Sequence, residues 1–172
     1  MKRLFFVFLL AAPAFGQLLT STPNGIAVAH NSRLSISGKW TTEGVENPTF
    51  ITSNDQQIAV LDALNNEAVI ADLTTGKSTR MRTAETPIAA AFLNGELYVL
   101  ARDARVLQHG TTQIPLSVDP SFLREGNGRL YVYGRAEGVI EEIQNDQVTR
   151  RVSIAPHASD FEIAGTTAYL VY

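Results

Sequence analysis

Two arginines in this 172-residue chain are well suited to hold an acidic ligand. Arg102 and Arg135 each follow an apolar run that contains tyrosine, and a guanidinium can bind a carboxylate or a phosphate through two hydrogen bonds. Aspartate, asparagine and histidine stand at comparable places along the chain. The candidate ligand-binding residues are Asp62, Asn65, Arg102, Asp103, Arg135 and His157. The alternative is that they are ordinary solvated loop residues, because loops are polar whether or not they bind.

Motifs that would predict a catalytic reaction are absent from the sequence. It contains no GxSxG, HExxH, Walker or EF-hand pattern. The three histidines, His30, His109 and His157, are isolated, whereas a zinc site needs several converging ligands. Glu141 and Glu142 are neighbours in a predicted strand, so they point to opposite faces and make a poor acid–base pair. We therefore expect no catalytic residue, no metal and no cofactor.

The first residues have the three parts of a secretory signal peptide. Lys2 and Arg3 are basic, Leu4 to Phe15 is apolar, and small residues precede a predicted cleavage after Gly16. The apolar run is shorter than the roughly 20 residues that cross a bilayer, so we expect no membrane span. The predicted location is periplasmic or secreted. The chain has no cysteine, so its fold must be stable without disulfides.

The charge of the chain argues against a nucleic-acid interface. The full chain has 14 basic and 17 acidic residues, and removal of Lys2 and Arg3 leaves 12 against 17, a net charge of −5. Nucleic-acid binding would need a clustered basic patch. The neighbouring arginines at 80 and 82 and at 150 and 151 are interpreted as solvated strand residues.

A repeat organises most of the chain. GELYVLARD at 95–103 and GRLYVYGRA at 128–136 are nearly the same sequence. Apolar strand phrases begin at Ile58, Leu97, Leu130 and Ala168, which are 39, 33 and 38 residues apart. Prolines precede them at Pro48, Pro87, Pro120 and Pro156, with spacings of 39, 33 and 36. Sequence features that recur together at nearly equal spacings indicate a structural repeat.

Each repeat unit is predicted to hold four short antiparallel strands. In the third unit these are 122–124, 130–133, 139–143 and 148–154, with Gly126-Asn127-Gly128 supplying the positive φ of a tight hairpin. Units of 33 to 39 residues with four strands are typical of β-propeller blades, which stack because one blade cannot bury its own faces. The predicted fold class is therefore an all-β propeller. A β-sandwich of hairpins is the alternative, but it does not explain the recurring proline.

The Leu-Tyr-Val phrase, followed by a polar loop, an apolar strand and a Thr-Gly-Lys turn, resembles the YVTN β-propeller repeats of exported bacterial and archaeal proteins. The stretch IAVLDALNNEAVIADLTTGK at 58–77 carries the resemblance best, and the likeness covers about 48–172. Repeats of that family usually have asparagine shortly after Tyr-Val, whereas this chain has Leu61-Asp62, Leu100-Ala101 and Tyr133-Gly134. The resemblance implies the architecture of the superfamily.

The repeat divides the mature chain into an N-terminal part and blades. We expect N-terminal strands at 17–47, in which 25–40 is interpreted as the end of an earlier blade with 34–37 as its outer strand, then blades at 48–86, 87–119 and 120–155 and an incomplete blade at 156–172. That makes about 3.5 to 4 blades. Three explanations fit a final blade of two strands: a longer reading frame, a ring closed by two copies, or a small ring closed by strands from 25–37. An apolar edge strand at the C-terminus would favour self-association.

Position in the blade indicates where a ligand would bind. The loops between second and third strands and the connections between blades emerge on one face, which carries the six candidate residues together with Glu85, Asp119 and Asp160. We expect an exported, non-enzymatic binding module for a protein, glycan or small ligand. The alternative is part of a propeller enzyme, such as a lactonase-like hydrolase or a quinoprotein-like dehydrogenase. Its metal or cofactor ligands would then be Asp62, Asp103, Asp119 and His157.

Overall fold

The computed structural model describes residues 18–30, 32–36, 39–165 and 167–172. The predicted signal peptide and its cleavage site lie outside the described residues. The described residues form 18 strands and no helix. Across these residues, no helix is long and apolar enough to cross a bilayer.

The strands form four four-stranded antiparallel sheets and one two-stranded sheet, which we call blades 1 to 4 and the half blade. Blade 1 contains β1 (Leu18–Thr22), β2 (Gly25–His30), β3 (Arg33–Ile36) and β4 (Trp40–Glu43). Blade 2 contains β5 (Phe50–Ser53), β6 (Gln57–Asp62), β7 (Glu67–Asp72) and β8 (Ser78–Arg82). In each of these sheets, chain order is also spatial order.

The remaining sheets follow the same plan. Blade 3 contains β9 (Pro87–Leu93), β10 (Glu96–Ala101), β11 (Val106–His109) and β12 (Thr112–Pro115). Blade 4 contains β13 (Pro120–Gly126), β14 (Arg129–Gly134), β15 (Val139–Gln144) and β16 (Gln147–Ser153). The half blade contains β17 (Asp160–Ala164) and β18 (Thr167–Val171). The four strands predicted for the third sequence unit are thus confirmed as β13 to β16.

Tight turns join the first and second strands where the sequence predicts them. Asn127 and Gly128 both have positive φ, at 54° and 69°, and Asn94 and Gly95 repeat the pattern at 52° and 85°. Asparagine and glycine tolerate this conformation, and two such residues in succession make a hairpin turn that matches strand twist. The first hairpins of blades 3 and 4 therefore follow from local sequence.

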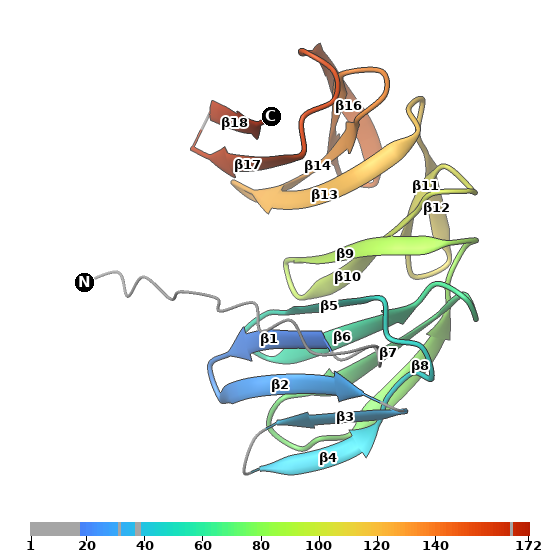
Figure 1. Ribbon diagram of the computed structural model, residues 1–172, viewed down its shortest axis with the longest axis vertical. Coiled ribbons are helices and arrows are strands. Elements are labelled where there is room, and N and C mark those ends of the chain that lie inside the picture. The colour runs from blue at the N-terminus through green and yellow to red at the C-terminus, as the bar shows by residue number, and fades with distance from the viewer. Residues whose placement is uncertain (1–17, 31, 37–38, 166) are drawn as a thin grey trace.

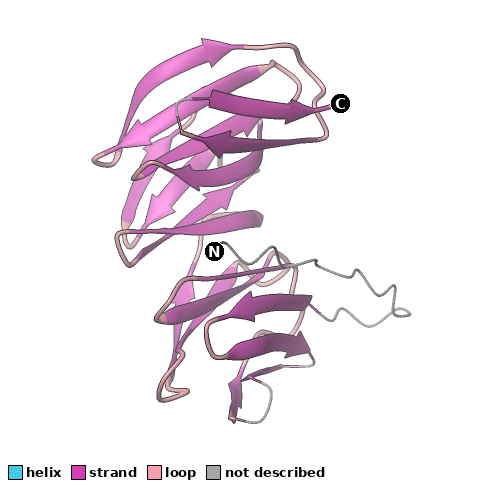
Figure 2. Cartoon of the chain, turned by 90° about the vertical axis from the view of Figure 1, so that its left-hand side faces the viewer, coloured by secondary structure: helices cyan, strands magenta, loops and turns pink. Residues whose placement is uncertain are grey.

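The blades stack face to face in an arc, from blade 1 at the bottom of Figure 1 to the half blade at the top. The first strands β1, β5, β9, β13 and β17 lie next to one another along the stack. The fourth strands lie at the outer rim, where most side chains are exposed or half-buried. Figure 2 shows the same stack turned by 90°. First strands that meet along a common axis, with meanders running outward, define a β-propeller.

Apolar side chains between successive sheets hold the stack together. The core between blades 1 and 2 contains Leu34 and Ile36 from β3 together with Ile58, Val60 and Val69 from blade 2. Similar cores join blade 2 to blade 3 and blade 3 to blade 4. The last core places Tyr133 and Phe161 between blade 4 and the half blade. Each blade buries its faces only against its neighbours, which is why the units must stack.

The N-terminal part is more complete than the sequence predicts. It forms a whole four-stranded blade, so the described residues hold four four-stranded sheets and one two-stranded sheet, where the sequence predicts about 3.5 to 4 blades. The predicted outer strand at 34–37 is in fact the third strand β3, in which residues 33–36 are described. The hypothesis that these strands complete the last blade is wrong for this structure, because β1 to β4 are hydrogen-bonded in a sheet of their own and β17 and β18 form a separate two-stranded sheet.

Candidate functional site on the loop face

The loops after the second strands and the connections between blades meet at one end of the blades, which we call the loop face. Hydrogen bonds join the two kinds of segment in three blades and beside the half blade. The contacts are Asn47 N–H to Asp62 Oδ2 (2.9 Å), Thr86 Oγ1–H to Asp103 Oδ2 (2.6 Å), Asp119 N–H to Glu137 Oε1 (2.9 Å) and His157 N–H to the Arg135 carbonyl (2.9 Å). All six candidate residues lie at this end of the molecule.

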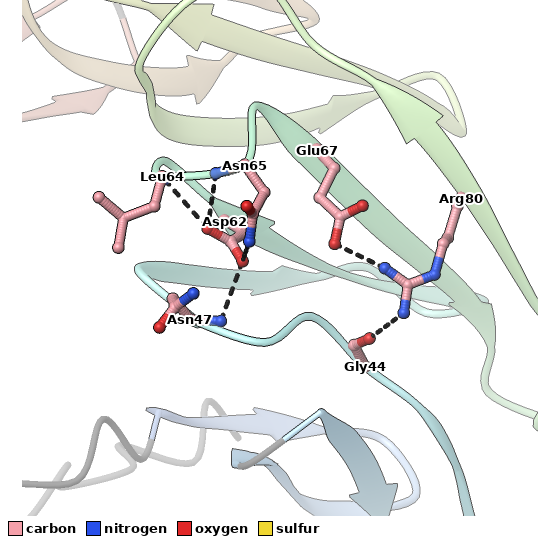
Figure 3. Close-up of polar contacts among 7 residues, drawn as sticks. All are labelled: Gly44, Asn47, Asp62, Leu64, Asn65, Glu67 and Arg80. Carbon is pink, nitrogen blue, oxygen red and sulfur yellow. Dashed lines mark hydrogen bonds and ion pairs between the residues drawn. The ribbon is translucent and has the colours of Figure 1, made fainter.

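Asp62 holds the blade 2 loop together. Its side chain is fully buried, and its two oxygens accept hydrogen bonds from the backbone of Asn47, Leu64 and Asn65 and from the Asn65 amide (Figure 3). Burial by itself would raise the pKa of Asp62, but these hydrogen bonds bring the pKa below its usual value. The carboxylate is therefore satisfied within the protein. Asn65 remains exposed beside it.

The blade 3 loop is arranged differently. Arg102 and Asp103 are both about half exposed and form an ion pair at 3.5 Å. The Thr86 hydroxyl lowers the pKa of Asp103, with a further contribution from Arg102. Thr86 also donates its N–H to Asn66 Oδ1 (2.8 Å) and accepts a hydrogen bond from Arg102 N–H (2.9 Å). Loops of blades 2 and 3 thus converge on one threonine.

Two residues of this cluster adopt a backbone conformation that their side chains disfavour. Thr86 has φ of 58° and Arg105 has φ of 50°. Positive φ is unusual for a β-branched residue or an arginine, and it costs on the order of 1–2 kcal/mol. The repeat spacings of 39 and 33 place Arg105 in register with Asn66 and Gly138, which have φ of 52° and 64°. Blades 2 and 4 use residues that tolerate this conformation, whereas blade 3 uses arginine.

Sequence reasoning missed Arg105 as a candidate. The signal is visible in the repeat, because aligning the blades puts an arginine where its counterparts are asparagine and glycine. Strained backbone conformations are concentrated at functional sites. Arg105 is exposed and forms no ion pair with any described residue. It therefore joins Arg102 and Arg135 as a third exposed guanidinium on this face.

Blade 4 contributes Arg135 and, through its connection to the half blade, His157. Both are exposed, and the Arg135 guanidinium has no ion pair within the part of the chain that the structure describes. The nearby Glu137 carboxylate accepts the backbone N–H of Asp119. Asp160 pairs with Arg124 on β13 and accepts the N–H of Phe161. On this face, several carboxylates accept hydrogen bonds from groups of the loops, while arginine side chains project into solvent.

The structure does not gather the four residues that the enzyme alternative requires. Asp62, Asp103, Asp119 and His157 belong to different loops, and Asp62 is enclosed by its own hydrogen bonds. Among the described residues, no three histidine, aspartate or glutamate side chains are placed to hold a metal ion. Glu141 and Glu142 are used separately, in ion pairs with Arg151 (2.7 Å) and Arg129 (2.5 Å). Arg151 is therefore an ion-pair partner of a buried glutamate rather than only a solvated strand residue.

One histidine, although isolated in the sequence, has close polar and aromatic partners in the structure. His109 Nδ1 lies 3.1 Å from both carboxylate oxygens of Asp146, and its ring stacks on Tyr98 at 4.3 Å between centroids. Tyr98 donates its hydroxyl to Asp146 (2.8 Å); burial and this carboxylate raise the pKa of Tyr98 to about 12. The cluster joins blade 3 to a turn of blade 4 at the end opposite the loop face. No sequence signal links residues so far apart.

Solved structures similar to this chain have low sequence identity to it. A streptogramin B lyase has a TM-score of 0.74 at 17% identity, over 94% of this chain and 64% of the other. A catalytically inactive virginiamycin B lyase from Staphylococcus aureus, determined with quinupristin, has 0.74 at 14% identity, over 94% and 65%. Hydrazine synthase from Kuenenia stuttgartiensis has 0.63 at 19% identity, over 76% and 43%.

These comparisons bear on the fold. No family model matches the chain, and no curated protein sequence matches it. The chain spans less than two thirds of the length of each of these three proteins. Because one fold supports many functions, identities this low show architecture and not activity. The chain is therefore an all-β protein with the propeller architecture that virginiamycin B lyase also has.

Proposed function

We propose that this chain is a non-enzymatic β-propeller module that binds a ligand bearing carboxylate, phosphate or sulfate groups on its loop face. The observation that carries the proposal is Arg105, which is held at positive φ where sister blades have asparagine and glycine. A residue that costs stability without packing in the core is retained most readily for contact with a ligand. Arg102 and Arg135 are exposed on the same face.

The arrangement of charges supports the same ligand class. Asp62, Asp103 and Glu137 accept hydrogen bonds from the protein's own loops, so these carboxylates are committed to shaping the face. The guanidiniums of Arg105 and Arg135 have no ion pair among the described residues. Loops that are already fixed lose little entropy on binding, and guanidiniums bind acidic groups in pairs of hydrogen bonds.

The location and family remain part of the proposal. The signal-peptide pattern at 1–16 favours export to the periplasm or the medium. The Leu-Tyr-Val repeats favour kinship with YVTN-type propellers. The partner would be a glycan, a protein surface or a small molecule outside the cytoplasm, and its acidic groups are the shared chemistry.

The test uses two acidic polymers as probes, polygalacturonate for carboxylates and heparin for sulfates. We expect the protein to bind at least one of them at about 0.15 M salt despite its own net negative charge. An Arg102→Gln/Arg135→Gln variant should lose roughly tenfold or more in affinity, because hydrogen bonds to charged groups contribute about 1.5–3 kcal/mol each. Biolayer interferometry gives the affinities, and circular dichroism checks the fold.

A charge-matched variant separates a specific face from general electrostatics. Lys77→Gln/Arg150→Gln removes two exposed positive charges away from the loop face. It should bind as the unaltered protein does. Equal losses in both double variants, or no binding of either polymer by the unaltered protein, would contradict the proposed face and ligand class.

The second candidate is part of a propeller enzyme, and the observation in its favour is the structural likeness to streptogramin B and virginiamycin B lyases. Quinupristin accompanies the inactive variant of the latter, so it is the first substrate to try. Consumption of quinupristin by the purified chain, followed by mass spectrometry, would replace the binding-module proposal. Unchanged quinupristin after prolonged incubation, with the polymer binding described above, would favour the module.

A further inference from the structure

A polar hollow of about 640 Å³ lies where the interface between blades 1 and 2 opens toward the loop face. Blade 1 and its connection line it with Ser32, Glu43 and Glu46. Blade 2 lines it with Asn65, Glu67, Arg80 and Arg82. Its volume is in the range of sites that hold small molecules. It is distinct from the arginines of blades 3 and 4.

The floor of the hollow is fixed by hydrogen bonds (Figure 3). Arg80 bridges the two blades, since Nη1 contacts Glu67 Oε1 at 2.5 Å and Nη2 donates to the Gly44 carbonyl at 2.6 Å. Gly44 itself lies close to the backbone of β3, where a Cβ would be 2.8 Å from the Arg33 carbonyl carbon. Gly44 N–H also donates to the Ser32 carbonyl (2.8 Å). These contacts hold both walls in place before any ligand arrives.

The blade 2 wall is fixed from behind by Asp62. Asn65 donates its side-chain amide to Asp62 Oδ2 (2.8 Å), which leaves the Asn65 oxygen as an acceptor. Glu67 and Arg82 are cross-strand partners of β7 and β8, so their side chains share a face of the sheet. Pre-organised polar groups of this kind give specificity at low entropic cost.

The lining specifies a charged ligand. Five of its seven side chains are ionisable, and none is aromatic or aliphatic. A sugar ring or an apolar ligand would find no stacking surface there. Arg80 and Glu67 satisfy each other, whereas Glu43, Glu46 and Arg82 form no ion pair within the described part of the chain. Two carboxylates on the blade 1 wall thus face the hollow together with one guanidinium from blade 2.

From this distribution we propose that the hollow binds a small zwitterion, a free amino acid or a short peptide with both termini charged. The ammonium group would be held by Glu43 and Glu46, and the carboxylate by Arg82 through paired hydrogen bonds. Asn65 and Ser32 would bind the amide or backbone groups between the two charges. A ligand with one charge would leave the opposite wall unpaired.

The experiment titrates the purified protein with alanine, Ala-Ala and tri-alanine, followed by NMR and calorimetry. We expect at least one of the three to bind with a dissociation constant near or below about 1 mM, as suits a ligand of about ten heavy atoms. N-acetyl-Ala-Ala lacks the ammonium group and Ala-Ala amide lacks the carboxylate. Each should bind at least about tenfold more weakly than Ala-Ala. Comparison of alanine with the peptides distinguishes a free amino acid from a peptide terminus.

Variants test which wall of the hollow binds which charged group of the ligand. Arg82→Gln should weaken the binding of Ala-Ala but leave the already weak binding of Ala-Ala amide unchanged. Glu46→Gln should also weaken the binding of Ala-Ala, but leave the already weak binding of N-acetyl-Ala-Ala unchanged. Arg150→Gln lies elsewhere and should have no effect. No binding by any of the three zwitterions, or equal binding of blocked and unblocked peptides, would overturn the proposal. This result would leave polymer binding at Arg102 and Arg135 unaffected.

Discussion

The loops at 62–66 in blade 2 and 101–105 in blade 3 occupy the same place in the repeat but are stabilised in different ways. Blade 2 has the buried Asp62, which accepts four hydrogen bonds, where blade 3 has Ala101. Blade 3 relies on the exposed Asp103, which accepts the Thr86 hydroxyl. At the end of the loop, positive φ falls on asparagine in blade 2 and on Arg105 in blade 3.

This difference separates residues that serve the fold from residues available for function. The blade 2 loop uses a side chain suited to each local task, a carboxylate for clustered N–H groups and asparagine for positive φ. The blade 3 loop has strain at Arg105, its hydrogen-bond partner Thr86 in the preceding connection is also strained, and the loop leaves charged groups in solvent. We therefore expect the blade 3 loop to contribute less to stability than the blade 2 loop.

The largest expected effect is that of Asp62→Ala. Four N–H groups would lose their acceptor in a buried place, which should lower the free energy of unfolding by about 2–4 kcal/mol. Asp62→Asn should lower the free energy of unfolding by less than Asp62→Ala does, because asparagine keeps one acceptor oxygen. Urea unfolding followed by circular dichroism measures both. A loss below about 1 kcal/mol for alanine would show that water replaces the carboxylate, and the contrast with blade 3 would fail.

The second prediction concerns acid. Hydrogen bonds hold the folded-state pKa of Asp62 below the usual value of an aspartate, so the hydrogen-bonded carboxylate stabilises the fold above about pH 4. That contribution is lost as the pH falls through the lowered folded-state pKa. The stability advantage of the unaltered protein over Asp62→Asn should therefore shrink as the pH falls below about 4. A difference that stays constant across this range would argue against the ionised carboxylate as its source.

The third prediction is a gain in stability. Arg105→Gly should raise the free energy of unfolding by about 0.5–1 kcal/mol, because glycine relieves the strain at positive φ but adds entropy to the unfolded chain. The same change in blade 2, Asn66→Gly, should be destabilising, since Asn66 Oδ1 accepts the Thr86 N–H. Thermal unfolding compares them. Opposite signs would support the contrast between the loops, and a stable Arg105→Gly variant with weaker polymer binding would support the binding face.

The smallest effect is expected for Asp103→Ala. Asp103 is exposed, and water can satisfy both Thr86 and Arg102 when the carboxylate is removed. The unfolding midpoint should move less than in any variant above. A loss of stability close to that of Asp62→Ala would mean that the two carboxylates contribute equally to stability despite their different exposure.

The strands of blades 2 to 4 were predictable because their determinants are local. Alternating apolar residues, asparagine–glycine turns and the repeat of Leu-Tyr-Val phrases fix each meander within about 35 residues. Blade 1 was only partly predicted, since its sequence lacks the tyrosine phrase and the preceding proline. Its strands are identified as a blade by the core that Ala27, Leu34 and Ile36 share with blade 2.

The candidate site was predictable as a set of loops but not as a set of roles. Blade topology places the six candidate residues at one end, as expected from the order of strands. The sequence does not distinguish Asp62 from Asp103, although one is buried and the other is about half exposed. The aligned repeat shows that Arg105 replaces asparagine and glycine, but its positive φ is known only from the structure.

The sequence by itself determines an all-β chain of four-stranded units, their turns and the end at which their polar loops emerge, since these depend on neighbouring residues. Only the tertiary structure decides which side chains of different blades come into contact. It joins His109 to Asp146 and Arg80 to Gly44, and it forms the hollow lined from both blades 1 and 2. The physical reason is that these contacts depend on the stacking of faces, which no spacing along one strand encodes.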